Sequence, residues 1–495
     1  MELGIPFIEK DLQVHDVSNG DEAFTVITPY CLMPVARYYW TNRGDKTMNN
    51  VPMTRPEEML AEHRTHFNTS MTFVELEDGR ILQAGGTKFT LSEDGGITWS
   101  EPFERKDADG NPVGLRGKAL VNLSGNGIGL AADIRAYDVP RSEQRYPWNR
   151  DVAHPVFWPS EDGGETWESP VRVTSPGLGT FFYRDTLTRT SSGRIILPVY
   201  ISLGQGTGPG DTRPPASGKL VMNQWVSTAA HFFDPHFSAV YVCYSDDDGR
   251  TWKRNKDGEL LILQDWNATY SYANEPSVAE VAPGRLLMVM RTGLGRLFQA
   301  WSYDNGETWT RPQPSPLAAS TAPAKIRTIP STGHLLIVWN QENEEEVKGG
   351  YNRTRISSAI SRNGGSVWEF FQNVESIHET TRVEPGPIRP VRPAEYHFEP
   401  GLPAPERERE HVLPAPVHAR YTYPSVLVTK SDRVLISYPY SYYEEHPARA
   451  ELIRVGHSES GRVEKLKVLP LSWFYGGKEP ADNPFLPSAY ESATP

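Results

Sequence analysis

One octapeptide pattern recurs along the chain and limits the folds that the sequence can adopt. Four segments follow the pattern S-x-D-x-G-x-T-W: SEDGGITW at 92–99, SEDGGETW at 160–167, SDDDGRTW at 245–252 and SYDNGETW at 302–309. A degenerate fifth copy, SRNGGSVW, covers 361–368. The four copies start roughly 57 to 85 residues apart. Self-similarity at such a period indicates a propeller or another repeat architecture.

The residue types of the octapeptide point to a structural role. Asp and Gly favour a tight turn, because Asp bonds to nearby backbone groups and Gly tolerates a positive φ. The terminal Trp is a large apolar side chain that can fill the space between neighbouring strands. We therefore interpret the octapeptide as a folding device and do not expect its Asp residues to be catalytic.

A second pattern precedes the octapeptides and predicts β-hairpins. Alternating apolar residues surround a short turn in MTFVELEDGRILQAG and in EPSVAEVAPGRLLMVMR, and this period of two is typical of strands. Related segments occupy 117–133, 185–201, 324–340 and 423–438. Six units of four strands predict an all-β fold, a six-bladed β-propeller over 71–475. Residues 1–70 are expected to add a strand that closes the ring and a rim loop, and 476–495 to form a tail.

The alternation of strands predicts which residues share the working face. The octapeptides and the hairpin turns lie on one face, so the starts of the first and third strands and the ends of the second strands lie on the other. Glu275 and Arg291 then meet on the rim of blade four, Arg353 lies on blade five and Tyr423 on blade six. We also place Arg184 and Asp185 (blade three) and Asp133 and Arg135 (blade two) there. The long connections 41–67, 136–153, 201–238 and 376–420 fall on the same face, as functional loops commonly do.

Composition restricts the partners. The formal charge of −12 over 495 residues argues against nucleic acid or an anionic membrane as a partner, and no stretch approaches the ~18 apolar residues of a membrane span. Cys31 and Cys243 are the only cysteines, so neither a disulfide framework nor a CxxC metal motif is expected, and no cofactor is predicted. The N-terminus MELGIPFIEKDLQVHD lacks a signal-peptide pattern, which predicts a cytoplasmic protein or a secreted one whose signal was removed.

The octapeptides resemble the Asp-boxes of the sialidase superfamily, and the chain is similar to BNR-repeat sialidase-like proteins over about 70–475. The stretch NEPSVAEVAPGRLLMVMR resembles the family segment that carries the Glu partner of a tyrosine nucleophile and one arginine of a carboxylate-binding triad. These fall on Glu275 and Arg291. A later triad arginine matches Arg353 and the tyrosine matches Tyr423. The resemblance implies a retaining exo-glycosidase in which a Tyr attacks the anomeric carbon.

The chemistry of these residue types agrees with that implication. A phenol with an unperturbed pKa near ~10 needs an adjacent base, which Glu275 could be. Two arginines offer planar forks for the carboxylate of an acidic sugar. The alternative is that Glu275 and Arg291 form a rim ion pair and that Tyr423 is a packed aromatic residue.

The sequence departs from the family pattern in blade one. Asn68 or Thr69 stands where the first triad arginine is expected, and the connection AGGTK contains no acid for proton donation. His63 and His66 are the candidate acid or base groups, with Asp133, Asp138 and Asp185 behind them. The HxxH spacing could also suggest zinc, but no third ligand is identifiable.

Several functions therefore remain open. The first is an exo-acting, sialidase-type glycoside hydrolase for a terminal acidic sugar. The others are a lyase or hydrolase for a different sugar, and a glycan-binding propeller without catalysis. The proline-rich insertion 377–420 is expected to overlie the pocket or to contact a neighbouring subunit in a homo-oligomer.

Overall fold

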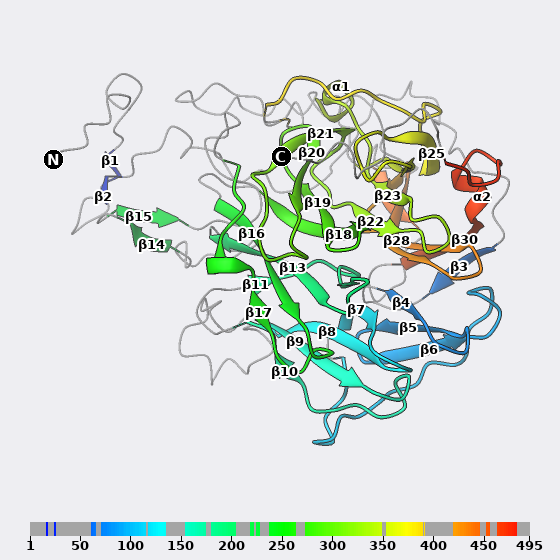
Figure 1. Cartoon of the computed structure of the whole chain (residues 1–495). Coiled ribbons are helices and arrows are strands. Elements are labelled where there is room, and N and C mark those ends of the chain that lie inside the picture. The colour runs from blue at the N-terminus through cyan, green and yellow to red at the C-terminus, as the bar shows by residue number, and fades with distance from the viewer. Residues whose placement is uncertain are drawn as a thin grey trace.

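The computed structural model describes the blades and the segments between them (Figure 1). The described residues are 71–114, 117–134, 154–174, 180–203, 237–263, 273–348, 353–389, 391, 419–445, 452–455 and 463–482, with short strands at 16–17, 24–25, 61–65, 218–221 and 224–227.

Six antiparallel sheets form the blades of a β-propeller, which confirms the predicted fold. Blade one contains β4 (Thr72–Glu75), β5 (Ile81–Gly85) and β6 (Lys88–Ser92). Blade two contains β7 (Gly117–Asn122), β8 (Ile128–Ile134), β9 (His154–Ser160) and β10 (Val171–Arg172). Blade three contains β11 (Thr180–Phe181), β12 (Thr188–Arg189), β13 (Ile195–Leu203), β16 (Phe237–Ser245) and β17 (Lys253–Arg254), followed by the 3-10 turn η3 (Lys256–Gly258).

The second half of the ring has the same design. Blade four contains β18 (Asn274–Ala282), β19 (Arg285–Arg291), β20 (Arg296–Ser302) and β21 (Gln313–Ala318). Blade five contains β22 (Lys325–Thr328), β23 (Leu335–Trp339), β24 (Arg355–Ser361) and β25 (Glu369–Ser376), with the short helix α1 (Glu344–Lys348) after β23. Blade six contains β26 (Ala419–Tyr421), β27 (Ser425–Val428), β28 (Arg433–Glu445), β29 (Leu452–Val455) and β30 (Val463–Pro470). The helix α2 (Leu471–Phe474) follows it, and two small hairpins, β1 (Asp16–Val17) with β2 (Phe24–Thr25) and β14 (Gly218–Val221) with β15 (Gln224–Ser227), lie outside the blades.

The ring is closed by its inner strands and by an N-terminal strand. The inner strands contact one another in the cyclic order β4, β7, β12, β18, β22, β27 and back to β4. The strand β3 (Ala61–Thr65) precedes blade one in sequence, yet it pairs antiparallel with β30 as the outer strand of blade six. Strands from before blade one and from the end of blade six thus share one sheet, which closes the ring.

The Asp-box turns are held by a repeated set of bonds. In the first copy, Asp94 accepts hydrogen bonds from the backbone N–H and the hydroxyl of Thr98, and Trp99 donates its indole N–H to the carbonyl of Gly96. Partial burial alone would raise the pKa of Asp94, but these bonds and one from Ser92 lower it to about 2. Equivalent bonds recur around Asp162, Asp247 and Asp304.

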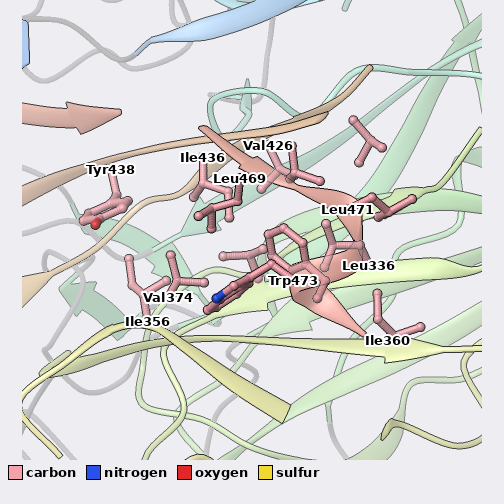
Figure 2. Close-up of a cluster of buried hydrophobic side chains, with 14 of the residues drawn as sticks. Leu336, Ile356, Ile360, Val374, Val426, Ile436, Tyr438, Leu469, Leu471 and Trp473 are labelled. Atoms are coloured by element: carbon pink, nitrogen blue, oxygen red, sulfur yellow. The ribbon is translucent and has the colours of Figure 1, made fainter. Parts of the chain in front are cut away.

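The core lies between blades, where strands of neighbouring sheets face each other. Figure 2 shows one such cluster, in which Leu336 and Val374 of blade five meet Ile436 and Leu469 of blade six, with Trp473 of α2 among them. Complete burial of these side chains removes apolar surface from water at each blade junction, at roughly 25 cal/mol per Å². No helix in the described part of the chain is long and apolar enough to cross a membrane.

Candidate active site on the propeller rim

Glu275 and Arg291 meet because β18 and β19 are adjacent antiparallel strands. Asn274 at the start of β18 pairs in register with Arg291 at the end of β19. The guanidinium of Arg291 donates a hydrogen bond to the carboxylate of Glu275 at 2.5 Å, and both side chains are buried. A buried ion pair of this geometry fixes both groups, because either charge alone would be costly in this environment.

Tyr423 joins this pair from blade six. It lies two residues before β27, and its hydroxyl is 3.4 Å from a Glu275 carboxylate oxygen and 3.5 Å from Arg291 Nη1. A tyrosine hydroxyl within reach of a carboxylate is the arrangement that a base-activated nucleophile requires. Chain positions 148 residues apart thus come together at one point of the rim.

Arg353 lies on the other side of Tyr423. Its guanidinium carbon is 5.3 Å from the centre of the Tyr423 ring, and it donates hydrogen bonds to Thr422 Oγ1 at 3.0 Å and to the Thr321 carbonyl at 2.9 Å. Two arginines from different blades therefore flank the same tyrosine. With Glu275 paired to Arg291, the two guanidinium groups and this carboxylate carry a formal charge of +1 (two positive and one negative charge), which suits an anionic group of a ligand.

The backbone at this site adopts unusual conformations. The φ angles are 39° at Glu275, 64° at Arg353 and 54° at Tyr423, all in the left-handed region that non-glycine residues seldom occupy. Asp185 of blade three has a φ of 53°. Residues held in such conformations cluster at functional sites.

Tyr183 packs against Tyr423 and Lys325 lies against Tyr183, and the sequence patterns did not identify either as a site residue. The Tyr183 ring centre is 5.4 Å from that of Tyr423, and its hydroxyl donates to the Pro424 carbonyl at 2.8 Å. Lys325 Nζ lies 4.5 Å from the Tyr183 ring centre. Burial holds the pKa of Tyr183 well above and that of Lys325 well below their usual values. Tyr183 directly precedes Arg184 and Asp185 at a predicted strand start, and this position was the sequence signal that could have identified it as a site residue.

Arg184 and Asp185 extend across the channel and bind neighbouring blades. Arg184 donates to both carboxylate oxygens of Glu464 in blade six, at 2.6 and 3.1 Å, and also to Ser425 and Ser437. Asp185 forms an ion pair with Arg327 of blade five at 2.8 Å. Both side chains are buried and bonded to protein groups, and their role in substrate binding stays a prediction.

The remaining predicted site residues lie either in strands or outside the described part of the chain. Asp133 lies within β8 and is fully buried, and His63 is part of β3, paired in register with Leu466. Arg135, His66, Asp138, Asn68 and Thr69 lie outside the described residues. The acid-free connection in blade one is a tight one, because β5 ends at Gly85 and β6 begins at Lys88. Within the described ranges, no group of three or more His, Cys, Asp or Glu side chains could hold a metal ion.

The first part of the proline-rich insertion lies on the rim of blades four and five. We call residues 377–391 the strap. Val391 donates its backbone N–H to the Gly293 carbonyl at 2.9 Å, and Arg389 pairs with Glu344 at 2.6 Å. Gln341 accepts from the Val383 N–H at 2.8 Å. These contacts place the strap beside the connections that follow Arg291 and precede Arg353. Residues 392–418 lie outside the described part of the chain.

The fold and the site define a class of protein, a six-bladed β-propeller with Asp-box turns and a Tyr–Glu–Arg cluster on one rim. The BNR repeat-like domain family matches residues 140–436, more than half of the chain, and the chain belongs to this family. A sialidase from Bacteroides fragilis (strain YCH46) is 26% identical over 337 residues, which make up 64% of this chain and 52% of that protein. The chain thus spans about half the length of this relative.

Two solved structures also resemble the chain. A protein of unknown function from Dyadobacter fermentans DSM 18053 is 16% identical, with a TM-score of 0.48 over 83% of this chain and 98% of that one. The intramolecular trans-sialidase from Ruminococcus gnavus, in complex with oseltamivir carboxylate, is 13% identical, with a TM-score of 0.48 over 86% of this chain and 100% of that one.

Proposed function

We propose that the protein is an exo-acting glycoside hydrolase of the sialidase type that removes a terminal acidic sugar from a glycan. The observation that carries the proposal is the contact of the Tyr423 hydroxyl with Glu275 at 3.4 Å, while Arg291 holds the same carboxylate at 2.5 Å. Glu275 takes the phenolic proton as the Tyr423 oxygen attacks the anomeric carbon, the glycosidic C–O bond breaks, and a covalent glycosyl-tyrosine forms. The departing oxygen keeps the bonding electron pair and takes a proton from water. Water then attacks this intermediate, which gives net retention of configuration.

Arg291 and Arg353 are the proposed binding groups for the sugar carboxylate. They approach Tyr423 from adjacent blades, so one anion beside the tyrosine can contact both of them. The relationship to the Bacteroides fragilis sialidase supports a sialic-acid-like sugar as the first substrate to test. The partner under this proposal is a carbohydrate, and the experiments below assume neither a cofactor nor a metal.

The role of the arginines predicts a charge-specific loss of binding. Arg353→Ala should weaken an acidic sugar roughly ten- to a hundredfold, because a charge-assisted hydrogen bond contributes ~1.5–3 kcal/mol. A neutral analogue should lose far less. Calorimetric titration of both ligands measures the difference. Arg362→Ala is the matched control, because Arg362 pairs with Glu369 in the Asp-box turn on the opposite face. Equal losses for acidic and neutral ligands would contradict an anionic substrate.

A glycan-binding propeller without catalysis is the second candidate. It is favoured by the two-residue connection between β5 and β6, which holds Gly86 and Thr87 and thus no acid for the leaving group. Aryl glycosides of sialic acids, uronic acids and neutral sugars separate the candidates, because aryl leaving groups depart with little help from a general acid. Release of phenol with a saturated free sugar supports the hydrolase, release of phenol with an unsaturated sugar indicates a lyase, and binding without release of phenol supports the second candidate.

A further inference from the structure

Glu342 is a buried carboxylate directly behind the rim that carries Arg353. It lies in the connection after β23 of blade five, which corresponds to the connection after β19 and Arg291 in blade four. Its side chain is 0% exposed. One carboxylate oxygen accepts a hydrogen bond from the backbone N–H of Thr354 at 2.7 Å and another from the Thr354 hydroxyl at 3.2 Å. Thr354 is the residue immediately after Arg353, so Glu342 holds the turn in which Arg353 lies.

This turn needs support from its surroundings. Arg353 has a φ of 64°, a conformation that costs a non-glycine residue free energy unless neighbouring groups fix it. Tyr421 of blade six donates its backbone N–H to the Arg353 carbonyl at 2.8 Å, and Glu342 accepts from the Thr354 N–H at 2.7 Å. Both bonds hold the single peptide unit that joins Arg353 to Thr354. The Arg353 guanidinium is thereby aimed at Thr422 and at the ring of Tyr423.

The strap contributes a second contact to the same threonine. His378 Nε2 lies 2.8 Å from Thr354 Oγ1, so the threonine hydroxyl is shared between Glu342 and His378. The charged groups packed around this cluster are Glu346 of α1 and Arg355 of β24, which bond to each other at 2.8 Å. Among the described residues, the groups that set the charge behind Arg353 are therefore Glu342, Glu346, Arg355 and His378.

We propose that Glu342 is a positioning residue that holds Arg353 for the substrate carboxylate and takes up a proton when an acidic sugar binds. This inference rests on the proposed function, because it assigns a carboxylate to the place in front of Arg353. A new negative charge there repels the ionised form of Glu342 and favours the protonated form. Glu342→Gln keeps an oxygen that can accept from the Thr354 N–H but has no proton to gain.

The titration of the neighbouring groups makes Glu342 the proton acceptor near neutral pH. Burial raises the pKa of Glu342 to about 7. The hydrogen bond from Thr354 lowers this pKa and the negative charge of Glu346 raises it, but burial has the largest effect. Burial and the charge of Arg355 lower the pKa of His378 to about 4, so His378 is neutral at pH 7. The affinity for an acidic sugar should therefore rise as the pH falls through about 7.

The experiment is calorimetric titration of the full-length protein near pH 7 in buffers of different ionisation enthalpy. The probes are the 2,3-unsaturated analogue of N-acetylneuraminic acid and its neutral methyl ester. Wild-type protein should bind the acid with a fractional uptake of protons and the ester with none. Glu342→Gln should bind the acid without uptake and with an affinity that no longer changes between pH 6 and 8. Glu345→Gln is the control, since Glu345 lies in the same connection and is exposed.

A third variant tests positioning apart from charge. Glu342→Leu removes the acceptor for Thr354, so the affinity for the acid should fall about tenfold while the affinity for the ester changes little. Glu342→Gln keeps an acceptor, so its affinity for the acid at pH 6 should be higher than that of the leucine variant and close to the wild-type value. If wild-type protein binds the acid and Glu342→Gln takes up the same number of protons on binding, this inference alone is overturned. Absence of binding of the acid to wild-type protein would overturn it together with the proposed function.

Discussion

Tyr423→Phe is expected to lower turnover of the acidic aryl glycoside by at least about a thousandfold and to leave the fold intact. The substitution removes only the oxygen that attacks the anomeric carbon, and loss of a nucleophile costs several orders of magnitude in other covalent mechanisms. The phenyl ring keeps its contacts with Tyr183 and with Arg353. Steady-state kinetics gives the turnover, and thermal unfolding of both proteins checks the fold.

Tyr183→Phe is the matched control for this variant. Tyr183 lies beside Tyr423, but its hydroxyl bonds to the Pro424 carbonyl. Loss of that hydroxyl should cost about 1 kcal/mol of stability and far less activity than the loss of the Tyr423 hydroxyl. Turnover in Tyr423→Phe within tenfold of the wild-type value would rule out the nucleophile, whatever the control shows.

Glu375→Gln is expected to lower the free energy of unfolding by about 3–5 kcal/mol. Glu375 of β25 is fully buried between Lys465 Nζ at 2.6 Å and Lys467 Nζ at 3.1 Å, both from β30, and it also accepts a hydrogen bond from Tyr438. The amide removes the carboxylate charge that two buried ammonium groups contact at the junction of blades five and six. Denaturant unfolding measures the loss. Glu369→Gln on the same strand is the control, because its partly exposed ion pair with Arg362 should contribute under about 1 kcal/mol.

The same carboxylate predicts a stability loss in acid. Burial opposes ionisation of Glu375, but Lys467 and Lys465 outweigh it and lower the pKa from 4.5 to about 2. A lowered pKa in the folded state means that the stabilisation is complete above about pH 4.5 and is lost as the pH falls from there to about 2. The lowering of the pKa from 4.5 to about 2 corresponds to about 3 kcal/mol of the free energy of unfolding. The stability curve of Glu375→Gln should lack this component, and parallel curves for the two proteins over this window would contradict the assignment.

The blades could be predicted because their signals are local. An Asp-box turn is specified within eight residues by bonds such as those of Asp94 with Thr98 and Ser92, and a hairpin by its alternating apolar residues. The meeting of Glu275 with Arg291 follows from the register of one hairpin. Strand order predicted that Tyr423 and Arg353 lie on the same rim. The distance from the Tyr423 hydroxyl to Glu275 and that from Arg353 to the Tyr423 ring agree with this placement.

The contacts of long side chains across the channel could not be predicted in this way. Strand order places Arg184 at a strand start of blade three, but its guanidinium spans the channel to Glu464, 280 residues further along the chain. A buried guanidinium takes the carboxylate that satisfies it, and a pattern of strands does not specify that partner. Glu342 was missed for a related reason: it lies after the apolar run of β23, in a connection whose acidic composition resembles an exposed loop.

Covalent labelling of Tyr423 is the most direct test of the proposed mechanism. The protein is incubated with a 2,3-difluoro sialic acid, whose fluorine atoms slow hydrolysis of a glycosyl-enzyme intermediate, and is then digested and analysed by mass spectrometry. We predict one added sugar on the peptide that contains Tyr423, and no adduct in Tyr423→Phe. Two results would contradict Tyr423 as the nucleophile, provided that wild-type protein turns over the acidic aryl glycoside. One is an adduct on another residue, and the other is labelling that persists in Tyr423→Phe.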